Sequence, residues 1–134
     1  MKHTNNLLRA FSLFLCLLLP ILAFALTACT KLPDRVGTGS VTFGVTVTDL
    51  DGTQEEFEVR TDEKNVADAL TKAGLVSGEN SEYGLYIKVV NGITADYNAD
   101  GTYWSLLVDG EYSMVGASSV PVTEGLRIEL KKTK

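Results

Sequence analysis

Two dipeptides, Asn91-Gly92 and Asp109-Gly110, constrain the fold of this chain more than any other feature. Each lies between stretches in which apolar and polar residues alternate, as expected of strands that are buried on one face. Two-residue turns of this kind are typical of β-hairpins, because Asn, Asp and Gly accept the positive φ angles that such turns require. The same alternation occurs over residues 41–47, 85–89 and 126–130. The sequence therefore predicts a domain built largely from hairpins.

One helix is expected among these strands. Thr61-Asp62 offers an N-cap, Gly74 offers a C-terminal stop, and apolar residues recur between them at i, i+3, i+4 and i+7, which predicts a helix over residues 62–73. The segment 49–52 predicts the turn of a hairpin whose second strand contains Phe57 and Val59. Further strands are expected at 93–97, 103–108 and 111–115, with a turn at Gly78, a polar loop at 98–102 and a solubilising tail at 131–134. This order indicates an α+β fold with one helix packed on a mixed sheet built from hairpins.

The first 28 residues are typical of a secretory signal. A short polar start contains Lys2 and Arg9, and an apolar run follows over residues 11–26. The four residues Leu26-Thr27-Ala28-Cys29 then resemble the lipobox of bacterial lipoproteins, a resemblance that implies cleavage before Cys29 and attachment of lipid to its thiol. The alternative is a plain signal peptide with an incidental cysteine.

Three regions follow from this interpretation. Residues 1–28 are the signal peptide, residues 29–40 are the lipidated cysteine with a flexible tether, and residues 41–134 are one folded domain. The tether assignment depends on the one Pro and two Gly among residues 30–40. The expected location is the extracytoplasmic face of the bacterial membrane, where the lipid would hold the protein.

Composition narrows the chemistry of the domain. The chain has one histidine, His3, and two cysteines, Cys16 and Cys29, so the domain predicted after the tether has neither residue type. Nucleophilic catalysis by Ser–His–Asp or Cys–His groups and zinc sites made of His or Cys are therefore excluded there. Without residues 1–28, 10 basic residues stand against 17 acidic ones, which disfavours nucleic acid as a partner. We expect a protein that is not an enzyme and has no cofactor.

One short motif has the letters of a calcium loop. Asp96, Asn98 and Asp100 stand at alternate positions before Gly101, as oxygen ligands do in such loops. The twelfth position, where a bidentate Glu is expected, is Leu107. A turn rich in Asp and Asn has the same letters without an ion, so we expect a turn and no metal site, with calcium as the open alternative.

Aromatic residues are the candidate binding residues. In a hairpin about Asp109-Gly110, residue numbers on opposite strands sum to 219, which places Tyr103 and Leu107 on one face with Tyr112 and Met114. Trp104 falls on the other face of the same strand. Tyrosine and tryptophan are enriched at binding surfaces because they combine an apolar ring with a polar atom. The alternative is that most of these residues pack in the core.

The same residues carry a family resemblance. The stretch from Val41 to Leu130 resembles a bacterial family of unknown function that is similar to the C-terminal domain of transcobalamin and intrinsic factor. The shared features are Phe57-Glu58-Val59, Asn65-Val66-Ala67-Asp68-Ala69-Leu70, Gly74-Leu75, Tyr83-Gly84-Leu85-Tyr86, Asn91-Gly92-Ile93, Ala95-Asp96-Tyr97, Tyr103-Trp104, Asp109-Gly110, Gly116 and Gly125.

The resemblance implies a β-grasp-like fold and a ligand. In the vitamin carriers this domain closes over cobalamin, which aromatic and apolar side chains of its hairpins contact. Carried over by position, the implied contacts are Tyr103 and Trp104, followed by Tyr112 and Met114, and the aromatic Tyr86 is a further candidate ligand-binding residue. The expected function is non-enzymatic ligand binding at the cell surface, with a corrinoid handed to an uptake system as the candidate ligand. The alternative is a protein-interaction or adhesion module that binds a surface protein.

Overall fold

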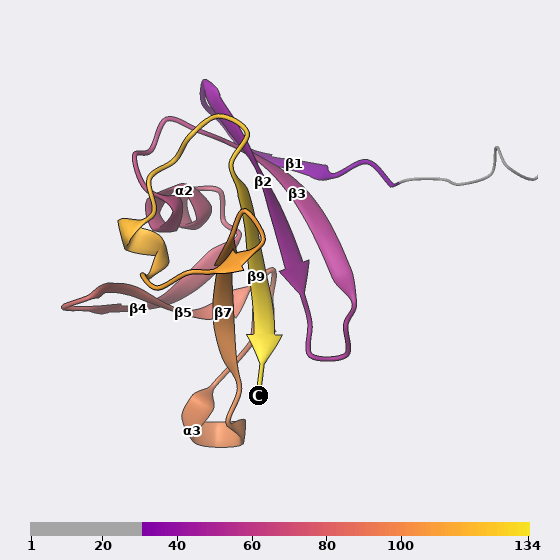
Figure 1. The fold of residues 1–134 in the computed structure, drawn as a ribbon, viewed down its shortest axis with the longest axis vertical. Helices are drawn as coiled ribbons and strands as arrows, with labels where there is room; N and C mark the ends of the chain where they lie inside the picture. Colours follow the sequence, from indigo (N-terminus) through magenta and orange to yellow (C-terminus); the bar gives the residue numbers. More distant parts are fainter. Residues whose placement is uncertain (1–30) are drawn as a thin grey trace, which may run out of the picture. The chain divides into compact units, whose positions relative to one another are not determined.

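The structure is a computed structural model that describes residues 31–134. Within these residues the fold is mixed α+β and consists mostly of strands, as the sequence predicted (Figure 1). One sheet has six strands in the order β1 (Asp34–Gly37), β3 (Gln54–Thr61), β2 (Val41–Thr48), β9 (Arg127–Thr133), β7 (Tyr103–Val108) and β8 (Glu111–Tyr112). The other sheet has three, in the order β4 (Val76–Ser81), β5 (Gly84–Val90) and β6 (Ile93–Thr94). The helical segments are α2 (Val66–Lys72), α3 (Tyr97–Asp100) and the 3₁₀ turn η1 (Ala117–Ser119).

The larger sheet is mixed. Strand β2 is antiparallel to β3 and parallel to β9, and β1 joins the far edge of β3 in parallel. Strand β7 is antiparallel to β9, and β8 pairs with the other edge of β7. The β2–β3 and β7–β8 pairings are therefore local hairpins. Strand β9 pairs with both β2 and β7 and so joins the two hairpins into one sheet.

The core lies between one face of this sheet and α2. Alternation along β2 buries Phe43, Val45 and Val47, and the helix contributes Val66 and Leu70, both fully buried. Figure 1 shows α2 and η1 on the same side of strands β2 and β9. We call the face opposite α2 the outer face; half-buried or exposed polar side chains on it include Thr42, Thr46, Glu56, Glu58 and Arg127.

Helix α2 begins later than the sequence predicted. Its N-cap is Asn65, whose side-chain oxygen accepts the Asp68 backbone N–H at 2.9 Å. The predicted cap at Thr61-Asp62 was wrong because Thr61 is still paired in β3. The C-terminal stop was predicted correctly: Gly74 has φ of 74°, and the following N–H, from Leu75, bonds the Leu70 carbonyl at 3.0 Å.

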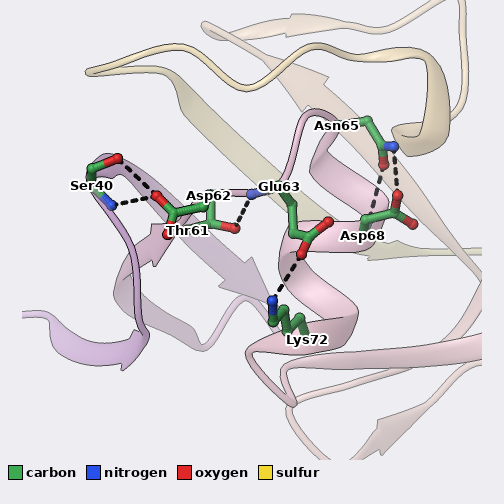
Figure 2. A network of polar contacts seen from close by, with 7 residues as sticks. All are labelled: Ser40, Thr61, Asp62, Glu63, Asn65, Asp68 and Lys72. Atoms are coloured by element: carbon green, nitrogen blue, oxygen red, sulfur yellow. Dashed lines mark hydrogen bonds and ion pairs between the residues drawn. The ribbon is translucent and has the colours of Figure 1, made fainter.

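Asp62 has a different role, which Figure 2 shows. Its Oδ1 accepts the Ser40 backbone N–H at 2.9 Å and the Ser40 hydroxyl at 2.7 Å. These hydrogen bonds stabilise the ionised carboxyl and hold the Asp62 pKa below its usual value. The contact ties the start of β2 to the segment that leads into α2. Near it, Lys72 closes an ion pair with Glu63 at 3.0 Å.

Part of the segment before β2, which the sequence predicted to be a flexible tether, is a strand. Residues 34–37 form β1, paired residue by residue with 57–60 of β3. An ion pair at 3.4 Å joins Arg35 to Glu58 across this pairing. Gly39 permits the close turn from β1 to β2, since a Cβ there would lie 2.1 Å from the Thr61 carbonyl carbon. The expected flexible tether of residues 29–40 is thus replaced by a strand over 34–37, because the edge of β3 offers unpaired backbone groups.

Several boundaries also shift. Gly78 lies at a bulge inside β4, where the sequence suggested a turn, and a Cβ on it would lie 1.9 Å from the Tyr86 carbonyl oxygen. The expected loop 98–102 contains the single turn of α3. The strands expected at 93–97 and 111–115 are shortened to Ile93–Thr94 and Glu111–Tyr112. The expected tail is largely strand, because Lys131–Thr133 continue the pairing of β9 with β7.

Among residues 31–134, no helix has the length and apolar character needed to cross a membrane. The signal peptide and Cys29 lie outside the described residues.

Candidate functional site

The β7–β8 hairpin has the predicted register. Leu107 pairs with Tyr112 and Val108 with Glu111, so the residue numbers sum to 219 as expected. Asp109 and Gly110 have φ of 50° and 87°, the conformation that a two-residue turn needs. Strand β8 ends at Tyr112, and the Ser113 backbone N–H still donates to the Leu106 carbonyl at 2.9 Å. The chain then folds into a tight turn in which the Ser113 hydroxyl donates to the Val115 carbonyl at 2.7 Å.

At the end of this hairpin and in the turn that follows it, apolar side chains are exposed to solvent. Tyr112 is 65% exposed and Met114 is 98% exposed, and Val115 is exposed as well. We call these three residues the hairpin tip. Large apolar side chains grouped on one short exposed segment indicate an interaction surface more often than an isolated exposed residue does.

Trp104 lies on the other face of β7. Its half-buried ring packs against the core, and its indole N–H donates to the Lys88 carbonyl of β5 at 3.1 Å. Trp104 therefore links the larger sheet to the smaller one. This contact gives the residue a structural role beside the ligand contact that the resemblance implied.

The other two candidates lie elsewhere. Tyr103 opposes Thr133 at the start of β7, whereas Tyr112 lies opposite Leu107 near the end of that strand. Tyr86 is exposed on β5 of the smaller sheet, opposite Glu79. The structure brings Tyr112 and Met114 onto one exposed segment and leaves Tyr103, Trp104 and Tyr86 at separate places.

A neighbouring turn adds an exposed aromatic residue to the region of the hairpin tip. Tyr83 lies in the β4–β5 turn and is exposed. The turn lies against η1, since the Leu85 backbone N–H donates to the Ser118 hydroxyl at 3.0 Å. The segment from Val115 leads directly into η1. The sequence signal for this residue was the stretch Tyr83-Gly84-Leu85-Tyr86, which carries part of the family resemblance.

The Asp96–Asp100 segment uses its carboxylates within the turn. Asp96 caps α3 by accepting the Asn98 backbone N–H at 3.0 Å, and Asp100 accepts the Thr102 backbone N–H at 3.0 Å. Bonds from the Thr102 hydroxyl and backbone hold the Asp100 pKa below its usual value. In the described part of the chain, no three His, Cys, Asp or Glu side chains gather in a way that could hold a metal ion.

A hollow opens on the outer face of the larger sheet. Its volume is about 370 Å³, and its floor is the stretch of β2 around Gly44. We call it the Gly44 hollow. The polar side chains and the proline that line it come from β2, β3, the start of β9 with the turn before it, and the segment before β1: Thr42, Thr46, Glu56, Glu58, Glu124, Arg127 and Pro33.

Two solved structures resemble the chain. A protein from Ruminococcus gnavus ATCC 29149, described as a candidate metal-binding protein, matches with a TM-score of 0.66 and 35% identity over 71% of this chain and 98% of its own. Haptocorrin in complex with Cbi matches with a TM-score of 0.58 and 25% identity over 73% of this chain. The matched region spans 26% of the haptocorrin chain, about a quarter of its length.

These likenesses confirm the resemblance expected from the sequence, since haptocorrin is a protein of the transcobalamin family. A comparison with curated proteins gives no match. Residues 63–134, more than half of the chain, match the family described as "Domain of unknown function (DUF4430)", and the chain belongs to that family.

Proposed function

We propose that this protein is a non-enzymatic binding protein that captures a corrinoid at the extracytoplasmic face of the membrane, held there by lipid on Cys29. The hairpin tip is the observation that carries the proposal. It offers a tyrosine and a methionine to a ligand on a domain that resembles part of haptocorrin, which was solved in complex with Cbi. We also propose the β-grasp-like description of the fold, since one helix packs across a mixed sheet.

The chemistry of the tip suits a large, partly apolar ligand. Full burial of a methionine side chain gains about 1.5–3 kcal/mol of transfer free energy, and a tyrosine adds an aromatic ring with a polar hydroxyl. Methionine also adapts its unbranched chain to irregular apolar surfaces. The matched region spans a quarter of haptocorrin, so we propose that a separate component of the uptake system completes the enclosure of the ligand.

The first test is calorimetric titration of residues 32–134 with cobinamide and with cobalamin. We expect saturable binding by the wild type and at least a tenfold loss of affinity when Tyr112→Ser and Met114→Ser are combined, because about 1.4 kcal/mol corresponds to tenfold. Both side chains are exposed, so the unfolding temperature should stay nearly constant.

Tyr97→Ser is the matched control. Tyr97 is 63% exposed, close to the 65% of Tyr112, but it belongs to α3 at the opposite end of β7. Its replacement should leave the affinity unchanged. Equal losses in both variants would contradict a site at the hairpin tip. No corrinoid binding by the wild type would reject the ligand and favour the alternative of a surface protein partner.

Lipid attachment has its own test. In cells grown with an alkyne analogue of palmitate, the wild-type protein should take up the label, because Cys29 supplies the thiol that accepts the lipid. Cys29→Ser should abolish labelling, and Cys16→Ser should leave it intact, because Cys16 precedes the expected cleavage point. Label retained in the Cys29→Ser protein would refute the anchor.

A further inference from the structure

Gly44 has no side chain at a position where the fold would accept one. It lies inside β2 with unbroken register to β3 on one side and β9 on the other. Its φ lies outside the left-handed region, and a Cβ built on it meets no atom within 4 Å. Glycine inside a strand weakens it and marks a bulge, a bend or the close approach of another group. The regular pairing excludes a bulge, and the open space at the Cβ position leaves room for the close approach of another group.

Charged groups surround this floor. Arg127 of β9 lies directly opposite Gly44, and Glu56 of β3 lies opposite Thr46, two residues along β2. Within residues 31–134, the Arg127 guanidinium and the Glu56 carboxylate make no hydrogen bond or ion pair. Strand spacing puts their Cα atoms about 12 Å apart on opposite sides of the hollow. An unpaired base and an unpaired acid thus face the same open floor.

The other two carboxylates that line the hollow, those of Glu58 and Glu124, already have partners within the protein. Glu58, also opposite Gly44, pairs through Oε1 with Arg35 at 3.4 Å and with Arg60 at 3.8 Å. Glu124 at the rim accepts the Thr42 backbone N–H at 2.9 Å. The charged groups left for a ligand are therefore one guanidinium and one carboxylate, together with the hydroxyls of Thr42 and Thr46.

We propose that the Gly44 hollow is a binding site for a small zwitterion of dipeptide size. Its carboxylate would pair with Arg127 and its ammonium group with Glu56, while its backbone passes over Gly44. Guanidinium–carboxylate pairs add hydrogen bonds to charge attraction and favour this orientation. The volume of about 370 Å³ suits a small ligand. This site is separate from the hairpin tip and does not depend on corrinoid binding.

The test follows backbone amide resonances of the isotope-labelled full chain in detergent micelles during titration with the dipeptide Ala-Ala. We expect saturable shifts at Gly44 and Arg127. N-acetyl-Ala-Ala, without the ammonium group, and Ala-Ala amide, without the carboxylate, should each bind at least tenfold more weakly. Equal binding of the blocked forms, or no saturable shift at Gly44, would overturn the proposal.

Gly44→Val distinguishes a binding role of Gly44 from a purely structural role. The variant should raise the unfolding temperature by a few degrees, since valine suits a strand and meets no clash. It should also abolish Ala-Ala binding by filling the floor. Arg127→Gln and Glu56→Gln provide independent variants at exposed positions, each with an expected tenfold loss, and Lys131→Gln on the same face is the control. Unchanged binding by Gly44→Val would refute the site.

Discussion

Leu70→Ala is expected to lower the free energy of unfolding by about 3–5 kcal/mol, because a fully buried leucine leaves both lost apolar contacts and a cavity when it is truncated. Leu70 lies on the buried side of α2 and belongs to the cluster that the helix forms with β2 and β9. Urea unfolding of residues 32–134, followed by the fluorescence of the single tryptophan, measures the change.

Leu50→Ala is the matched control for this measurement. Leu50 lies in the turn between β2 and β3 and is 50% exposed, so the same chemical change should cost less than about 1 kcal/mol there. A loss at Leu70 no larger than the loss at Leu50 would contradict the packing of α2 on the sheet.

Trp104→Ala is expected to cost about 3 kcal/mol, near the lower end for a tryptophan because the ring is only half-buried. The variant loses both the ring packing against the core and the indole hydrogen bond to Lys88. Because this bond joins β7 to β5, amide hydrogen exchange should accelerate more in β5 than in β2. Circular dichroism during urea unfolding gives the overall loss.

Trp104→Phe separates the contribution of the ring packing to stability from that of the indole hydrogen bond. Phenylalanine keeps an apolar ring but removes the donor, and the Lys88 carbonyl still accepts the Ala95 backbone N–H at 2.8 Å. We expect a loss of about 1 kcal/mol or less from this change. If Trp104→Ala costs no more than Trp104→Phe, the ring does not support the junction between the two sheets.

Local signals were sufficient for the hairpins and for the end of the helix. Asn91-Gly92 and Asp109-Gly110 adopt the positive φ angles that their residue types favour, so the turns and the register beside them could be predicted. Gly74 ends α2 for the same reason. The alternation over residues 41–47 likewise indicated which side chains of β2 are buried.

Features that depend on distant partners could not be predicted in this way. Asp62 has the sequence of a helix cap, but its carboxylate is taken by Ser40, 22 residues earlier. Residues 34–37 have no strand pattern of their own, and they become β1 because β3 offers an open edge. Trp104 was recognisable as a candidate contact, but only the packing of β7 beside β5 shows its bond to Lys88.

The candidate sites also combine features that local sequence predicts with features that depend on distant partners. The sequence by itself determined the α+β class, the hairpin that carries Tyr112 and Met114, and the family resemblance, because turn chemistry and alternation act between neighbouring residues. The tertiary structure alone decided that Arg127 and Glu56 face one hollow across Gly44. Arg127 lies in β9, Gly44 in β2 and Glu56 in β3, and the parallel pairing of β2 with β9 brings Arg127 beside Gly44. Pairings between strands far apart in the chain depend on the packing of the whole core, and no local pattern encodes them.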